Sequence, residues 1–320
     1  MTSRSGRAAL TRRTFLRSVA FTALAVPAAS GLAACTSGYD DAPDPLRTLW
    51  LQAEGHAKAA KALAAGSPEL GDVAERVAAI RTAHAEALRA EVQRLNRPVP
   101  EGEKAPAFGT DGGQFWQWLA ESKDAALALV GDLPRYRAGL VGAVAAGCAA
   151  AMELNPAGGA EEQAPRTATV KQLEDDTVPA LQTALRAEHA AVWVYSLVRA
   201  FLDEDYESAI TRGERAHLDR RDRCERVLSA AGRTPQPSEP AYVLDEQVTD
   251  PASAVRAVAT AESDAASAWH GVLERTDDKA VRTFAVHCLI GAATRGVHWR
   301  ADAGIDPAVP PLPGRQTTAD

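Results

Sequence analysis

Apolar residues recur at helical spacing through most of this 320-residue chain. One such series consists of Leu181, Leu185, Val192 and Tyr195, and it also includes the ionisable Glu188. Steps of three and four residues place these side chains on one face of a helix. Alanine is abundant, and the alternation of apolar and polar residues that is typical of strands is missing. The chain is therefore predicted to be all-α.

Segments rich in Pro and Gly divide the pattern into eight expected helices. We expect them at about 45–65, 69–96, 112–131, 134–153, 177–202, 205–231, 250–275 and 278–300. The first four predict a helical bundle over residues 45–154, and the last four predict a second bundle over 177–302. Residues 155–176 are expected to be a linker, and the Pro-rich residues 303–320 a disordered tail.

The first 34 residues have the pattern of an export signal. The stretch TRRTFLR contains the twin-arginine pair Arg12 and Arg13, and a moderately apolar segment follows that is a poor membrane span. The stretch LAAC, which ends at Cys35, looks like a bacterial lipobox, in which the cysteine is acylated. We expect a cleaved twin-arginine lipoprotein signal peptide, a tether over residues 35–44, and a lipid anchor on the outer face of the cytoplasmic membrane.

The charge and the motifs exclude several functions. Removal of residues 1–34 removes five Arg and no acid, so the formal net charge changes from −7 to −12. An acidic chain without a basic stripe does not favour nucleic-acid binding. The sequence has no GxSxG, P-loop, HExxH or dinucleotide-binding motif. Cys148, Cys224 and Cys288 are dispersed on apolar faces, which favours buried thiols over metal ligands and leaves one disulfide open.

Three helices of the second half each carry ionisable residues on a largely apolar face. These residues are Glu188, then Glu214 with His217 in an ExxH pair, and then Glu262. An isolated buried charge is costly, so Glu188 is expected to have a partner. Glu and His three residues apart point the same way and can hold one metal ion, for which iron, manganese and zinc suit these ligands.

The stretches AEHAAVWVY and AHLDRRD resemble those of actinobacterial, exported ferritin-like domains of unknown function, over residues of about 175–302. The resemblance implies a ferritin-like four-helix bundle. Such bundles take one Glu from each of two helices and an ExxH pair from each of the other two. Glu188, Glu214 with His217, and Glu262 match the first three helices, but the fourth has no acid and instead places Arg295 on its inward stripe.

The first half carries weaker copies of the same motifs. Glu54, His84 and Glu121 occur in the short motifs LQAE, AH and AES, as Glu188, His217 and Glu262 do in LRAE, AH and AES. This repetition predicts two tandem ferritin-like bundles, of which the first is degenerate, because Arg81 stands in the position that matches Glu214.

Two interpretations of the second bundle remain open. A single iron, manganese or zinc ion would be held by Glu188, Glu214, His217 and Glu262, and the protein would be an oxidase- or peroxidase-like enzyme. Alternatively, the core is polar but metal-free, Arg295 pairs with a glutamate, and the protein is a non-catalytic binding or scaffold protein of the cell envelope. The sequence favours the second interpretation. It does not identify a cofactor with certainty. It names no protein partner and leaves a homo-oligomer open, because a duplicated bundle can mimic a dimer.

Overall fold

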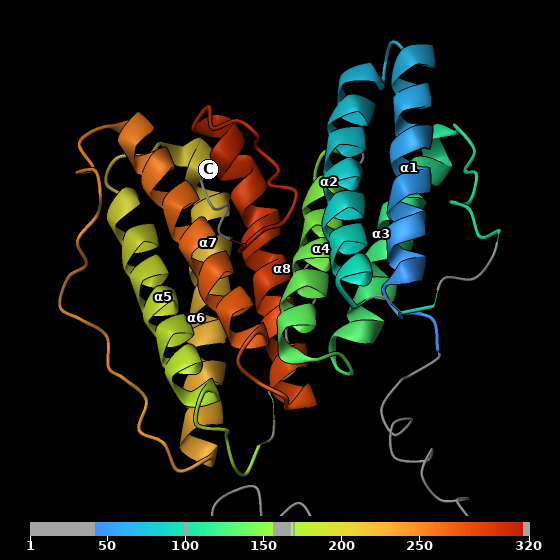
Figure 1. Ribbon diagram of the computed structural model, residues 1–320. Helices are drawn as coiled ribbons and strands as arrows, with labels where there is room; N and C mark the ends of the chain where they lie inside the picture. Colours follow the sequence, from blue (N-terminus) through green and yellow to red (C-terminus); the bar gives the residue numbers. More distant parts are fainter. Residues whose placement is uncertain (1–41, 96, 99–101, 156–167, 169, 316–320) are drawn as a thin grey trace, which may run out of the picture. The chain divides into compact units, whose positions relative to one another are not determined.

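The computed structural model describes residues 42–95, 97–98, 102–155, 168 and 170–315 (Figure 1). The helices are α1 (Arg47–Gly66), α2 (Gly71–Leu95), α3 (Gly112–Val130), α4 (Arg135–Met152), α5 (Thr177–Val198), α6 (Glu207–Ala230), α7 (Pro251–Leu273) and α8 (Lys279–Asp302), with a short 3-10 helix η2 (Glu204–Tyr206) before α6. No strand occurs among the described residues, so the prediction of an all-α chain is confirmed. The eight α-helices lie within four residues of their expected bounds.

Aspartate side chains fix the starts of three helices. Asp111 and Asp278 accept hydrogen bonds from the first backbone N–H groups of α3 and α8. Asp250 forms a capping box with Ser253 and is followed by Pro251, which suits the first position of α7. Local sequence chemistry therefore explains where these helices begin.

Three helix contacts of the first half have counterparts in the second, whereas the contact of α2 with α4 has no counterpart of similar extent. In the first half α1 packs against α2 and α3, and α3 packs against α4. In the second half α5 packs against α6 and α7, and α7 packs against α8. Figure 1 shows α5–α8 gathered side by side. The division into two bundles and their origin by duplication remain predictions.

Helix α4 joins the two halves. It packs against α2 and α3 and also against α7 and α8. Each of its residues from Arg137 to Ala151 is buried, and a helix that is apolar on all sides is expected to be surrounded in this way. The described residues from Ala42 to Arg315 accordingly belong to one compact unit.

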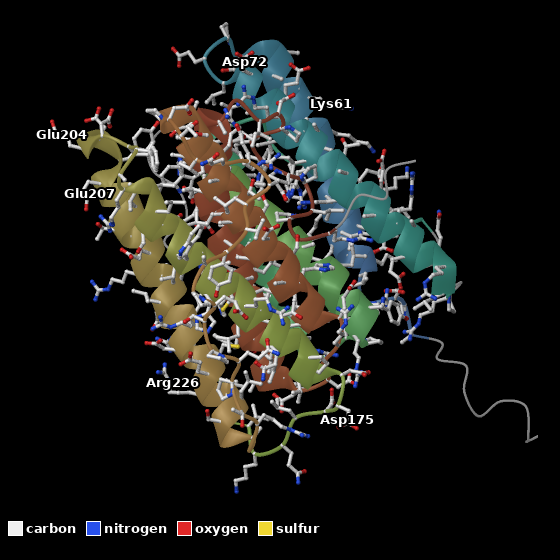
Figure 2. All side chains as sticks on the ribbon, turned by 90° about the vertical axis from the view of Figure 1, so that its left-hand side faces the viewer. Lys61, Asp72, Asp175, Glu204, Glu207 and Arg226 are labelled. Atoms are coloured by element: carbon white, nitrogen blue, oxygen red, sulfur yellow. The ribbon has the colours of Figure 1, made fainter. Side chains whose placement is uncertain are left out.

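Charged residues cover the outer faces of the helices. Figure 2 shows the labelled Glu207 and Arg226 at the outer edge of α6. Among the described residues, no helix combines the length and the apolar character needed to cross a membrane.

The segment after α8 corrects one expectation. The sequence predicts a disordered tail over residues 303–320, but the described part, up to Arg315, packs against the helices. Val309 is buried and Leu312 lies against the core. The backbone carbonyl of Pro311 accepts a hydrogen bond from Nε2 of His84 at 2.6 Å. A Pro-rich composition indicates a lack of helix, and tertiary contacts order this segment despite it.

Gly147 allows this contact, and its substitution tests the role of the segment. A Cβ atom at Gly147 would lie 2.1 Å from the Pro311 carbonyl oxygen and 2.6 Å from Nε2 of His84. We expect Gly147→Ala to lower the free energy of unfolding by about 1–3 kcal/mol and to expose residues 303–315 to proteases. Urea unfolding and limited proteolysis measure both effects. Gly66→Ala, which meets no atom within 4 Å, is the matched control. Wild-type stability and protease resistance in Gly147→Ala would contradict the prediction.

Candidate functional site

Three of the candidate residues meet in the interior of the second half. Glu188 on α5, His217 on α6 and Glu262 on α7 have at most 1% of their surface exposed. Nδ1 of His217 lies 2.6 Å from Oε2 of Glu188, and Nε2 lies 3.2 Å from Oε1 of Glu262. The imidazole therefore bridges two carboxylates and links three helices.

Other side chains also donate to these two carboxylates. Nε1 of Trp269 donates to Oε1 of Glu188 at 2.5 Å, and the Tyr195 hydroxyl donates to Oε1 of Glu262 at 2.6 Å. Arg295 on α8 donates to both oxygens of Glu262, at 2.8 Å from Nε and 3.2 Å from Nη2. We call Glu188, Tyr195, His217, Glu262, Trp269 and Arg295 the buried ion cluster.

The charges in the buried ion cluster favour an imidazolium at His217. Burial alone lowers the pKa of His217, but Glu262 and Glu188 outweigh burial and raise this pKa above 6.5. Burial alone raises the pKa of Glu262, but Arg295 and His217 bring it well below 4.5. Two carboxylates thus face one imidazolium and one guanidinium, and their formal charges cancel.

Arg220, another buried arginine, adds positive charge near the buried ion cluster. Arg220 on α6 is 1% exposed. Burial raises the pKa of Glu188, but the charge and hydrogen bond of His217 together with the charge of Arg220 lower it below 4.5. The next residue, Arg221, pairs instead with Asp222 at 2.6 Å. The inward positions of α6 include Gly213, His217, Arg220 and Cys224, which also have helical spacing.

The structure does not bring Glu214 to the cluster. Its carboxylate accepts hydrogen bonds from Ser196 at 2.9 Å and Arg199 at 2.8 Å. Gly213 takes the inward position, because a Cβ atom there would lie 2.3 Å from the ring of Tyr195. The close approach of Tyr195 to α6 turns Glu214 to the side of the helix.

These residues do not fit a metal ion. A metal would need a free imidazole nitrogen and free carboxylate oxygens, but both nitrogens of His217 face carboxylates and Arg295 spans Glu262. The ExxH partner, Glu214, lies outside the cluster. In the part of the chain that the structure describes, no group of three or more His, Cys, Asp or Glu is arranged to hold a metal ion.

The first half centres on a buried arginine. Arg81 is 1% exposed, and its guanidinium contacts His84 at 3.0 Å, Cys148 at 3.0 Å, Ser122 at 3.2 Å and His56 at 3.3 Å. Burial and the charge of Arg81 lower the pKa of both histidines to about 3, so both rings are neutral.

Only one of the three residues expected in this half lies in that core. His84 is fully buried, whereas Glu54 pairs with Lys58 and Glu121 accepts from Gln117 on the exposed surface. His56 and Ser122 reach Arg81 instead, and sequence reasoning missed them. Each lies one or two residues after the expected acid, so the helical face was assigned slightly out of register.

The structure also gives the state of the three cysteines expected in the mature chain. Cys148, Cys224 and Cys288 are buried, and no disulfide joins them. His189, which follows Glu188 and is not itself a candidate, faces the loop after α6, with its Nε2 3.3 Å from the carbonyl oxygen of Gln236. Arg12, Arg13 and Cys35 lie outside the described residues.

The four helices that hold the buried ion cluster, except for the first three residues of α5, fall within a known domain. Residues 180–317 match the model of a domain of unknown function, DUF4439. The second half of this chain is a DUF4439 domain. It includes the segment after α8, which the sequence prediction had excluded from the second bundle.

Comparison with solved structures gives a match to the crystal structure of a conserved hypothetical protein, rv2844, from Mycobacterium tuberculosis. The sequence identity is 31%, the match covers 41% of this chain and 93% of that chain, and the TM-score is 0.40. No curated protein matches the chain. The first half of the chain lies outside the residues matched to DUF4439.

The pKa shifts in the DUF4439 domain predict a pH-dependent stability. The raised pKa of His217 contributes stability that is complete below pH 6.5 and is lost as the pH rises through the folded-state value. The lowered pKa values of Glu188 and Glu262 contribute stability that is present above pH 4.5 and is lost as the pH falls through their folded-state values.

We therefore expect His217→Gln to cost about 3–5 kcal/mol between these two pH values, because it leaves two buried carboxylates without their shared cation. Urea unfolding at a series of pH values gives the difference between wild type and variant. This difference should shrink toward alkaline pH. A difference that stays constant up to alkaline pH would contradict an imidazolium at His217.

Proposed function

We propose that this protein is an exported, lipid-anchored, ferritin-like binding protein of the cell envelope without enzymatic turnover. The observation that carries the proposal is the set of donors around Glu188 and Glu262. In a ferritin-like bundle these carboxylates would correspond to metal-ligating helix positions, whereas here protein side chains already hold their oxygens.

Several features of the buried ion cluster argue against catalysis there. A catalytic metal site keeps an open coordination position, and a general acid or base must reach its substrate. Glu188, His217 and Tyr195 have no measurable exposure. Burial and the neighbouring Glu262 raise the pKa of Tyr195 well above 10, so its hydroxyl stays protonated and keeps donating.

The tandem arrangement is also part of this proposal. The contacts of α1 with α2 and α3, and of α3 with α4, correspond to those of α5 with α6 and α7, and of α7 with α8. Each half encloses a polar cluster between its helices, centred on Arg81 in one and His217 in the other. Duplication of one ferritin-like bundle accounts for both, and the packing of α4 on α8 would then replace the interface between two separate copies.

The proposed anchor can be tested in cells. Cys35→Ser should move the protein from the membrane fraction to the soluble fraction, because the acylation site is lost. Arg12→Lys/Arg13→Lys should retain the precursor in the cytoplasm. Fractionation followed by immunoblotting measures both, and Cys148→Ser, which changes a buried thiol, is the control for the cysteine variant. Membrane association in Cys35→Ser would contradict lipid anchoring.

The absence of turnover is tested by metal content and peroxide consumption. We expect residues 36–320, purified from the cytoplasm without a chelating tag, to contain iron, manganese and zinc far below one ion per chain, even after supplementation. Mass spectrometry measures the metals. Glu188→Ala/Glu262→Ala should lose stability without any change in metal content.

Glu54→Ala/Glu121→Ala changes two exposed glutamates and serves as the matched control. One metal ion per chain that disappears only in Glu188→Ala/Glu262→Ala, together with peroxide consumption, would support the oxidase- or peroxidase-like alternative and contradict the proposal.

A further inference from the structure

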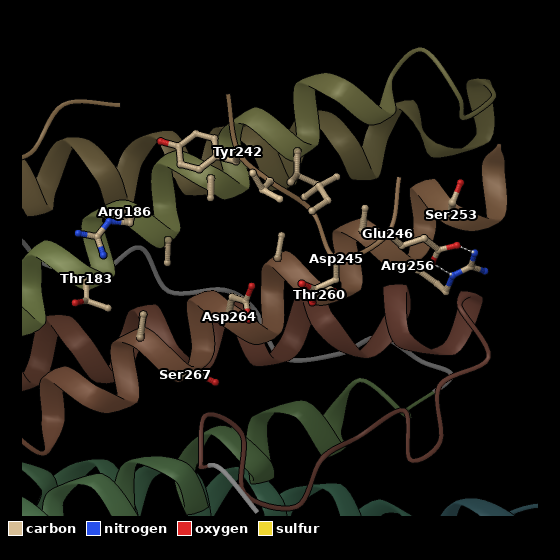
Figure 3. A pocket seen from close by; sticks show the side chains of 18 of the residues that line it. Thr183, Arg186, Tyr242, Asp245, Glu246, Ser253, Arg256, Thr260, Asp264 and Ser267 are labelled. Carbon is tan, nitrogen blue, oxygen red and sulfur yellow. Dashed lines mark hydrogen bonds and ion pairs between the residues drawn. The ribbon is translucent and has the colours of Figure 1, made fainter. Parts of the chain in front are cut away.

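An elongated groove runs between α5 and α7, on the side of the domain that the loop after α6 covers (Figure 3). Its volume is about 620 Å³, which lies in the range of small-molecule sites. On α5 its lining extends from Thr183 to Val194, which at 1.5 Å per residue corresponds to about 16 Å. The groove is therefore long enough for an extended molecule.

The walls of the groove are mostly apolar. Small side chains of the two helices form the floor, and they include Ala187, Ala190, Ala257 and Ala261. Tyr242 and Leu244 of the loop also line the groove, with Ile305 of the segment after α8. Small floor residues leave room for an apolar chain, and the loop residues provide apolar surface around it.

Two carboxylates face this groove. Asp245 comes from the loop and Asp264 from α7, and Figure 3 shows them near each other in the middle of the groove. Asp264 is partly buried. Burial and the charge of Asp245 raise the pKa of Asp264 above 3.8. Asp245 is exposed, and neither carboxylate has an ion pair or hydrogen bond with another described residue, so no cationic side chain of the described residues neutralises the pair.

The two arginines at the rim of the groove already donate hydrogen bonds to other side chains. Arg256 donates to both oxygens of Glu246, at 2.9 and 2.6 Å. Arg186 donates to Gln236 at 2.8 Å. It lies near Thr183 and Tyr242, at the end of the groove away from Arg256 (Figure 3). The middle of the groove thus presents negative charge between apolar walls.

We propose that this groove binds an elongated organic cation, with its ammonium group between Asp245 and Asp264 and its apolar chain along the alanine floor. A cation relieves the repulsion between the two carboxylates, and an apolar chain covers the exposed floor. An anion would meet the carboxylates unfavourably. This inference rests on the proposed binding role and assigns it a ligand class.

Calorimetric titration of residues 36–320 with four probes tests the ligand class. Octylamine combines charge and chain, octanol has only the chain, methylamine has only the charge, and octanoate reverses the charge. We expect octylamine to bind more tightly than the other three. Calcium chloride is a fifth probe, and binding of calcium in place of octylamine would indicate a simple cation site and overturn the proposal.

Matched variants test the position. Asp245→Asn and Asp264→Asn should each weaken octylamine binding by about fivefold or more, because each removes one charge partner. Asp219→Asn, which changes an acid of α6 paired with Arg223 outside the groove, should have no effect. Ala190→Leu, which narrows the floor, should weaken octylamine and octanol alike. Thermal unfolding verifies that each variant is folded.

Equal affinity for octylamine and octanol, or the same affinity in Asp264→Asn, Asp219→Asn and wild type, would overturn the groove assignment. A Lys-containing octapeptide that binds in place of octylamine would assign the groove to a protein partner and would also overturn it. The absence of metal-dependent turnover is measured separately, so failure at the groove leaves that part of the proposed function standing.

Discussion

The second half of this protein is organised around one buried imidazolium. His217 lies between Glu188 and Glu262 with no exposed surface, at 2.6 and 3.2 Å. Desolvation costs several kcal/mol per buried ion, so each ion at this depth needs hydrogen bonds or an opposite charge to compensate for the lost water. This requirement explains why Arg295 must reach Glu262 from α8 and why the indole of Trp269 points at Glu188. One network therefore ties α5, α6, α7 and α8 together.

The first half also contains a buried cation, but neutral groups surround it instead of carboxylates. Arg81 is buried among neutral histidines, a serine and a thiol, and its described contacts include no carboxylate. His84 extends this network, because its Nε2 donates a hydrogen bond to the carbonyl oxygen of Pro311 in the segment after α8. The chain end thus completes the core of the first half, and Gly147 leaves the space in which it does so.

Much of the fold could be predicted from the sequence, but only part of the site. Helical spacing correctly predicted the inward faces of α5 and α7, and hence the burial of Glu188 and Glu262. It assigned Glu214 inward because positions three residues apart differ by only about 60° around a helix. Packing decides which positions of α6 face inward. Here the ring of Tyr195 packs against Gly213, so Gly213 and not Glu214 faces the core. The order of the Pro-rich segment likewise depends on distant contacts that periodicity does not contain.

The protonation state of His217 tests the central claim most directly. Nitrogen-15 NMR of the histidine side chains, with His217→Gln to assign the resonance, reports whether one or both ring nitrogens carry a proton. The account predicts that both are protonated at neutral pH, because both face carboxylates, and that added zinc or manganese does not alter the signal. A neutral ring with one unprotonated nitrogen, or a resonance that shifts or broadens with stoichiometric metal, would contradict it.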